Sequence, residues 1–227
     1  FWLLMFGLFD AFILLWSGDI LVTYALAGAL LFLMRNHSVK SLFVCAGLLL
    51  VLMSLFHAAT QFGLNESYKA FDRVAIAQTS EPVGEINEAD RANADAWQEF
   101  SQDYWPTSDM QQSEMLDRTK NYTSVFSWTA KQNKDVYLFV LPVFFFWDVL
   151  AMMIIGMALY KTGVLQADRK RSFYIKLMIS GFTIGLSINS YEVYNAYSSQ
   201  FNIFSTFPQM QASYHFGRLA MAMGYIG

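Results

Sequence analysis

The sequence predicts an all-α integral membrane protein, a polytopic helix bundle that carries a helical insert on its extracytoplasmic side. Of its 227 residues, 55% are hydrophobic and 15% are charged, whereas soluble domains average roughly 45–50% and about 25%. The charges are also unevenly distributed, because residues 65–135 hold 13 of the 18 acidic and 7 of the 15 basic side chains. The rest of the chain consists largely of apolar runs.

Six apolar runs predict six membrane-spanning helices. A helix needs about 20 apolar residues to cross a hydrocarbon core of roughly 30 Å, and the runs meet or approach that length. They cover residues 1–16, 20–34, 41–63, 136–160, 173–191 and a segment that starts near residue 215. Because the first and last runs are cut by the ends of the sequence, we expect the chain to be the middle of a longer protein.

The runs fall into two groups of three helices, at residues 1–63 and 136–227, separated by an acidic insert at 64–135. Short cytoplasmic loops carry an excess of Lys and Arg, and the loops at 35–40 and 161–176 are rich in these residues. We therefore expect both loops to face the cytoplasm and the insert to lie outside the inner membrane of a bacterium. The net charge of −3 argues against a nucleic-acid partner, which would need a basic surface.

The insert is predicted to form short amphipathic helices. Trp97, Phe100 and Tyr104 recur at i, i+3 and i+7 and would form one apolar stripe. Ser108 followed by Gln111 predicts a capping box at the start of a second helix. An amphipathic cap on the membrane surface is one interpretation, and a substrate-reading domain is the alternative.

Small residues on the fifth and sixth runs predict that these two helices pack closely against a neighbour. The residues are Gly181 and Gly185 on the fifth run and Gly217, Ala220 and Gly224 on the sixth.

Ionisable side chains inside membrane spans are the candidates for chemistry. Each costs at least a few kcal/mol in lipid and normally faces the bundle interior or a watery cavity. We expect Asp148 near the middle of the fourth span and the others in the outer half of the bundle. The others are Asp10, Asp19, His57, Glu192, His215 and Arg218. Imidazoles, carboxylates and a guanidinium are the parts of a general acid–base site, and no nucleotide, zinc-protease or other metal motif accompanies them.

His57 is the sharpest candidate for a catalytic base. Ser54 and Gln61 lie three residues before and four residues after it, on the same helical face. We expect Asp10 or Asp19 to orient the imidazole. The alternative for His57 is an ordinary hydrogen bond between packed helices.

A second group of residues is predicted to bind the substrate, with packing or snorkelling of a long side chain as the alternative. The group consists of Asp148, Asn189, Glu192, His215 and Arg218.

Three segments resemble the bacterial YeiB-like membrane proteins. They are Gly18-Asp-Ile-Leu21 followed by Tyr24-Ala25, Gly156-Met-Ala-Leu-Tyr160, and the stretch from His215 to Gly227 that ends in Gly-Tyr-Ile-Gly. The resemblance implies a fold shared with transmembrane acyltransferases, which take an acyl group from coenzyme A and deliver it to an acceptor outside the cell. Where the family has a His in the first helix of this stretch, the sequence has Asp10.

Three functions follow as hypotheses. The first is a multi-pass acyltransferase that uses acyl-CoA as co-substrate, holds no permanent cofactor, and acts on an envelope sugar or lipid in the bilayer. The second is a transporter or lipid translocase whose path is lined by Asp148, Glu192 and Arg218. The third is a membrane scaffold, oligomeric or bound to a partner protein through the acidic insert.

Overall fold

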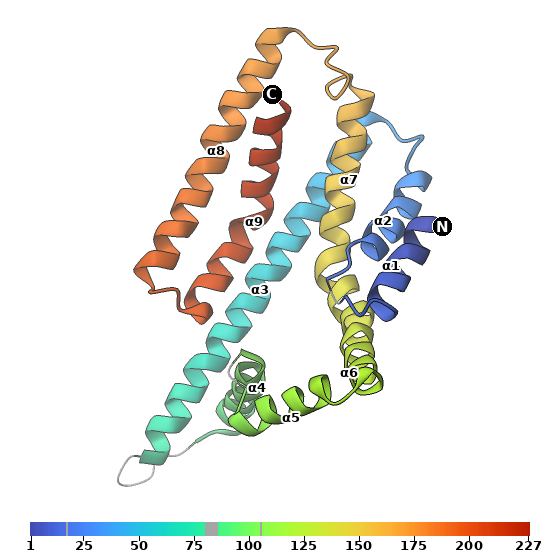
Figure 1. Cartoon of the computed structure of the whole chain (residues 1–227). Coiled ribbons are helices and arrows are strands. Elements are labelled where there is room, and N and C mark those ends of the chain that lie inside the picture. The colour runs from blue at the N-terminus through green and yellow to red at the C-terminus, as the bar shows by residue number, and fades with distance from the viewer. Residues whose placement is uncertain (17, 80–85, 105) are drawn as a thin grey trace. The chain divides into compact units, whose positions relative to one another are not determined.

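The chain is all-helical in the part that a computed structural model describes, residues 1–16, 18–79, 86–104 and 106–227, with backbone alone at 103–104 and 203–212. Helix accounts for 84% of the chain and the described residues contain no strand, which confirms the predicted all-α class. The elements (Figure 1) are α1 (Trp2–Phe12), α2 (Leu21–Leu33), α3 (Val39–Thr79), α4 (Glu88–Tyr104), α5 (Ser108–Thr119), α6 (Tyr122–Asp135), the π-helical segment η1 (Val136–Phe145), α7 (Phe146–Lys161), α8 (Arg171–Ser198) and α9 (Ile203–Ile226).

The chain divides into two compact units. Unit 1 contains residues 1–57 together with 129–227, and unit 2 contains residues 58–128. Unit 1 therefore holds most of the apolar runs, and unit 2 holds most of the acidic insert.

Two helices in the described part of the chain are long and apolar enough to cross a membrane. They are Val39–Thr79, with 41 residues, and the continuous helix Tyr122–Lys161, with 40 residues. Large apolar side chains such as Leu52, Leu55 and Phe139 are exposed on them, as expected of helices that face lipid. The predicted count of six spans is therefore wrong by this measure.

The other four predicted spans fail for two different reasons. α1 and α2 contain 11 and 13 residues, or about 16 and 20 Å of helix, and are too short to cross a 30 Å core. The chain leaves α1 through Leu15, whose φ of +60° is incompatible with a right-handed helix. α8 and α9 are long enough, with 28 and 24 residues, but polar side chains such as Thr183 and Arg218 reduce their hydropathy.

Helix α3 also ends later than predicted. The sequence places the end of the third span at Gly63, but the helix continues to Thr79. A single glycine costs a helix only about 1 kcal/mol, and the Lys69 ammonium lies 2.8 Å from Glu66 in an i, i+3 pair that supports the polar continuation.

The second long helix changes its winding within the membrane-length segment. The π-helical turns of η1 contain Pro142, which lacks an amide hydrogen and cannot complete a regular α-helical ladder. Wider turns of this kind are frequent at functional sites. Here they lie directly before the first turn of α7, which carries Asp148.

The core of unit 1 lies where α2, α3 and α7 meet. Leu42 and Ala46 of α3, Ala27 of α2 and Ile154 and Ala158 of α7 are fully buried in one apolar cluster. The spacing of four residues within α3 and within α7 places these side chains on one face of each helix.

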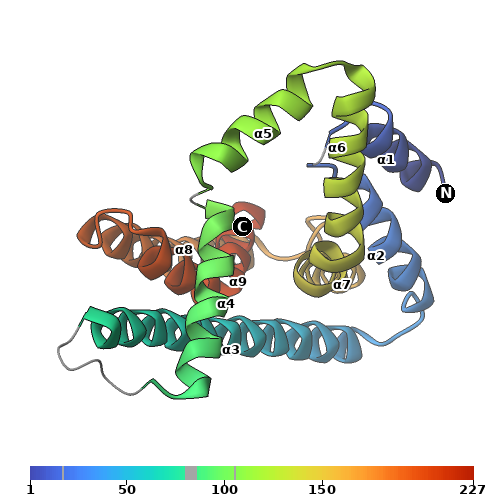
Figure 2. The ribbon, with the colours of Figure 1, turned by 90° about the horizontal axis from the view of Figure 1, so that it is seen from below.

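Helices α8 and α9 lie side by side in both views (Figures 1 and 2) and pack closely through glycine. A Cβ atom added at Gly181 would lie 2.3 Å from the backbone nitrogen of Gly224, and one added at Gly185 would lie 2.7 Å from the side chain of Met221. The predicted close packing of the fifth and sixth helices is therefore confirmed.

The two basic loops lie at the same end of unit 1. The Nζ atom of Lys161 donates a hydrogen bond to the carbonyl oxygen of Arg35 and another, of 2.7 Å, to that of His37. α7 ends beside them in a turn at Gly163, whose φ of +77° favours glycine. The contact brings the two loops together, and the side of a membrane that they face stays a prediction.

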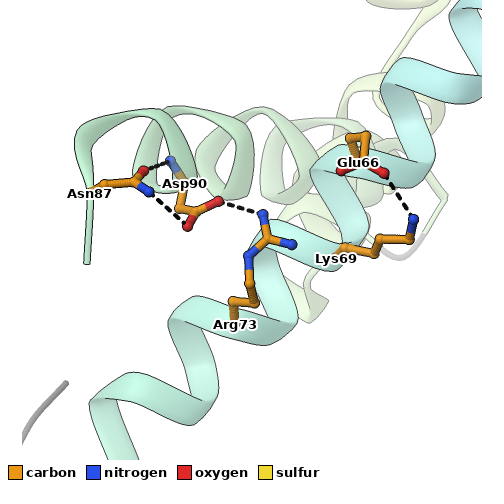
Figure 3. A network of polar contacts seen from close by, with 5 residues as sticks. All are labelled: Glu66, Lys69, Arg73, Asn87 and Asp90. Carbon is orange, nitrogen blue, oxygen red and sulfur yellow. Dashed lines mark hydrogen bonds and ion pairs between the residues drawn. The ribbon is translucent and has the colours of Figure 1, made fainter. Parts of the chain in front are cut away.

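Unit 2 is held by a small aromatic cluster and by ion pairs. Trp97 is buried, with its ring centroid 4.9 Å from that of Tyr68 and 5.9 Å from that of Phe100. Figure 3 shows Arg73 of α3 donating to Asp90 of α4, whose backbone amide is in turn held by Asn87. The predicted stripe is thus present for its first two members, and the side chain of Tyr104 lies outside the described residues.

The start of α5 differs by one residue from the prediction. Its N-cap is Thr107, whose Oγ1 accepts a hydrogen bond of 3.3 Å from the amide of Met110. Gln111 donates to the carbonyl oxygen of Pro106 instead of completing a capping box with Ser108. Both Thr and Ser are good caps, so the residue type could not distinguish them.

Candidate active site

Four of the predicted site residues converge inside unit 1. His57 comes from α3, Asp148 from α7, and His215 and Arg218 from α9. Nδ1 of His215 lies 2.9 Å from Oδ1 of Asp148, and Nε2 of His215 lies 3.2 Å from Nδ1 of His57. The exposed fractions are 1% for His215, 6% for Asp148 and 8% for His57. The three side chains thus form a buried relay in the order Asp148, His215, His57.

The hydrogen bonds define where the protons lie when both imidazoles are neutral. An ionised carboxylate only accepts, so Nδ1 of His215 carries the proton. Nε2 of His215 then has a lone pair and accepts from the Nδ1–H group of His57. The remaining nitrogen of the relay, Nε2 of His57, therefore carries a lone pair. In this arrangement His57 is the basic end.

Aromatic neighbours fix the orientation of the His57 ring. The His57 and His215 rings are nearly parallel, at 8° with centroids 5.1 Å apart, and the Phe144 ring lies parallel to His57 at 7° and 6.2 Å. Phe56 contacts both His57 and Phe144. Packing against these rings limits rotation of the imidazole and preserves its alignment with His215.

Arg218 balances the charge of the relay. Its Nη2 donates to Oδ1 of Asp148, the same oxygen that accepts from His215. Its Nη1 lies 3.3 Å from the hydroxyl of Tyr214, and the guanidinium lies 4.8 Å from the centroid of the Tyr214 ring. A buried carboxylate needs such a partner, because an isolated charge in an apolar helix bundle is strongly unfavourable.

Two polar atoms next to the relay have no hydrogen-bond partner among the described residues. They are Oγ of Ser54 and Nε of Arg218, both buried. Ser54 lies three residues before His57 on α3, and Arg218 lies three residues after His215 on α9. Three residues correspond to about 4.5 Å of helix. In both helices this displacement is toward the end of unit 1 that carries the basic loops. Buried polar atoms are normally satisfied, so both are suited to bind an oxygen of a substrate or a water molecule.

Asp19 has another role than the one predicted. Its carboxylate caps α2, with Oδ1 3.0 Å from the amide of Leu21 and Oδ2 3.1 Å from that of Val22, and it accepts a hydrogen bond of 3.4 Å from the hydroxyl of Tyr137. An acidic side chain at a helix N-terminus satisfies free amides and the helix dipole. The carboxylate that orients the histidine pair is Asp148.

Asp10 is half-buried on α1. His215 binds Nδ1 of His57 and Asp148 binds His215, so these two residues orient the imidazole, and a role for Asp10 at His57 stays a prediction.

Asn189 and Glu192 hold α8 to α9. Oδ1 of Asn189 lies beside Gly217, 3.1 Å from where a Cβ atom would be, and the carboxylate of Glu192 accepts a hydrogen bond from Ser213. The contacted residues, Ser213 and Gly217, lie on either side of His215 along α9, and Gly217 directly precedes Arg218. Their substrate-binding role stays a prediction, while their structural role is evident.

The prediction separated Asp148 from His215 because it misjudged where α9 begins. The sixth run was expected to start near residue 215, at the outer edge, but α9 starts at Ile203. His215 is therefore near the middle of its helix, level with Asp148. The polar residues before it concealed the helical turns that precede the apolar segment.

The described residues contain no group of three His, Cys, Asp or Glu side chains arranged to hold a metal ion. Comparison with protein-family models, with curated proteins and with solved structures finds no match for the chain. Function must therefore be inferred from the geometry of the site.

Proposed function

We propose that the chain is the core of a membrane acyltransferase in which His57 is the general base. The observation that carries the proposal is the buried relay from Asp148 through His215 to His57. A base that is oriented by a second hydrogen-bonded group is the recurrent arrangement for activating a hydroxyl nucleophile.

In the proposed reaction, Nε2 of His57 accepts the proton of an acceptor hydroxyl while its oxygen attacks the carbonyl carbon of an acyl thioester. The new C–O bond forms, the C–S bond breaks, and the proton passes from His57 to the departing thiolate. The positive charge that develops on the histidine pair is stabilised by the Asp148 carboxylate. Because the pair shares a hydrogen bond, this charge spreads over both rings.

Ser54 and Arg218 supply the second element of the site. Negative charge develops on the thioester oxygen during attack, and preorganised donors at that position are often the largest single contribution to catalysis. The unpartnered Oγ of Ser54 and Nε of Arg218 are suitable donors one turn from the histidines. Arg218 holds Asp148 through a different nitrogen, so its Nε stays available for this bond.

The resemblance to YeiB-like proteins suggests the substrates. On that basis the donor is acyl-CoA from the cytoplasm of a bacterium, and the acceptor is an envelope sugar or lipid. The two basic loops would then face the cytoplasm and the insert at 64–135 the outside. The apolar helices α3 and Tyr122–Lys161 support a membrane location for the reaction.

The test compares His57→Ala with His37→Ala in the full-length protein. His37 is an exposed loop histidine and serves as the matched control. Transfer of a labelled acyl group from acyl-CoA to envelope lipids and sugars should fall by about 10²–10⁴-fold in His57→Ala and stay unchanged in His37→Ala. Equal turnover in both variants, with unchanged melting temperatures, would exclude His57 as the base.

One observation favours proton-coupled transport as the second candidate. Asp148 and Arg218 form a partly buried ion pair next to two histidines, and such groups also serve as proton relays in transporters. The two functions differ in what they require, because transport needs a sealed compartment and acyl transfer does not. Activity in detergent micelles supports the enzyme, whereas substrate uptake found only in proteoliposomes supports the transporter.

A further inference from the structure

A groove on unit 1, separate from the histidine relay, has the form of a lipid-chain site. It has a volume of about 420 Å³, within the range of roughly 300–1,000 Å³ typical of ligand sites. Its walls come from α1, from α2 and from the continuous helix formed by α6 and η1. They include Leu8, Phe12, Leu26 and Leu141. These side chains are apolar, so the groove suits a hydrocarbon chain.

The polar end of the groove carries a cation. Lys134 and Tyr137 line it together with the apolar residues. The Tyr137 ring packs 5.9 Å from that of Phe12 and its hydroxyl donates to Asp19. Lys134 is exposed, and within the described residues no carboxylate pairs with it. Its ammonium is thus available to an anion at the mouth of the groove.

The position of Lys134 along its helix matches the depth of a lipid headgroup. It lies two residues before the apolar segment that begins at Val136, with Asp135 between them, where a membrane-crossing helix meets the interface. From Lys134 the groove follows the helix to Leu141, roughly 10 Å deeper. A phospholipid bound there would have its headgroup at the lysine and an acyl chain between the helices, as in the bilayer itself.

We propose that this groove binds an anionic phospholipid, with the phosphate at Lys134 and one acyl chain against Leu26 and Leu141. The charge of Lys134 favours an anionic over a zwitterionic headgroup. The carboxylate of Asp19, which accepts a hydrogen bond from Tyr137, is bound by the amides at the start of α2, and the positive end of that helix partly offsets its charge. The proposal does not depend on acyl transfer.

The headgroup is tested with phosphatidylglycerol and phosphatidylcholine of identical chains, titrated into the full-length protein and counted by native mass spectrometry. The wild type should prefer phosphatidylglycerol by roughly fivefold, the effect of one lysine near a charged surface. Lys134→Gln should abolish the preference. Lys131→Gln, on the same helix but outside the groove lining, should retain it. Equal binding of both lipids by the wild type would overturn the proposal.

The acyl chain is tested by filling the groove. Leu138 lines the groove and is 56% exposed, whereas its neighbour Phe139 does not line it and is 65% exposed. Leu138→Trp should reduce phosphatidylglycerol binding at least fivefold, and Phe139→Trp should leave it unchanged. If Leu138→Trp keeps its melting temperature and binds as well as the wild type, the chain does not occupy the groove. Binding of a free fatty acid but of neither phospholipid would also refute the proposed occupant.

Discussion

Removing the positive charge next to Asp148 is the most direct test of the buried ion pair. In Arg218→Met the aliphatic part of the side chain is preserved and the guanidinium is lost. The Asp148 carboxylate then keeps its hydrogen bond from His215 but loses its charge partner. We expect the full-length protein to be destabilised, because a buried carboxylate without a counter-charge is costly.

The magnitude follows from the burial of the two partners. The side chain of Asp148 is 9% exposed and that of Arg218 is 32% exposed. Breaking a fully buried pair costs about 3–5 kcal/mol, and breaking an exposed pair costs about 0–1 kcal/mol. Because Arg218 is partly exposed and His215 still binds the carboxylate, we expect the free energy of unfolding to fall by about 2–3 kcal/mol.

The measurement is reversible unfolding in mixed micelles, with Arg118→Met as control. Arg118 pairs with Glu114 on the surface of α5, where the side chains are 56% and 41% exposed, so its loss should cost less than about 1 kcal/mol. Adding Asp148→Asn to Arg218→Met removes both charges and should restore at least about 1 kcal/mol. The buried-pair interpretation fails if Arg218→Met is as mild as Arg118→Met, or if the double variant is less stable than the single one.

Two further predictions concern helix packing and pH. Gly181→Ala places a methyl group 2.3 Å from the backbone of Gly224 and should destabilise the protein by about 1–3 kcal/mol. The control is Gly47→Ala, because a Cβ atom at Gly47 has no other atom within 4 Å; it should be neutral or stabilising by up to about 1 kcal/mol. Thermal unfolding measures both effects. The hydrogen bond from Arg73 lowers the pKa of Asp90, so this pair stabilises unit 2 above the ordinary carboxyl pKa of about 3.9, and its contribution is lost as the pH falls further, through the folded-state pKa. Asp90→Asn should therefore flatten the decline of melting temperature in acid, and an unchanged decline would show that the pair does not contribute.

The sequence predicts element type better than element length. Apolar runs correctly indicate helices, because the hydrocarbon core leaves few alternatives for the backbone. They do not indicate where a helix ends, since polar turns continue α3 from Gly63 to Thr79 with the help of local ion pairs. The same effect extends α9 toward its N-terminus. Hydropathy measures which residues prefer lipid, and helix ends depend on caps and local hydrogen bonds instead.

The residues of the buried polar cluster could be predicted as candidates from the sequence, but the pairing among them could not. His57, Asp148, His215 and Arg218 are conspicuous because ionisable groups are rare in apolar helices. Their pairing depends on the relative depth of three helices, which follows from helix starts that hydropathy does not reveal. Asp19 illustrates the opposite error. It looked like a partner for His57, but a carboxylate directly before a helix has free amides within reach and binds them first.

The register of α9 links helix packing to the proposed chemistry. His215 and Arg218 are one turn apart on α9 and both donate to the same oxygen of Asp148. One full turn of an α-helix advances 5.4 Å along its axis. A shift of α9 along its axis by even part of this distance would break at least one of these bonds. Close contact with α8 at Gly181 opposes such a shift. Gly181→Ala should therefore reduce acyl transfer at temperatures where the protein is still folded, whereas an equally destabilising substitution in unit 2 should leave transfer intact until unfolding begins.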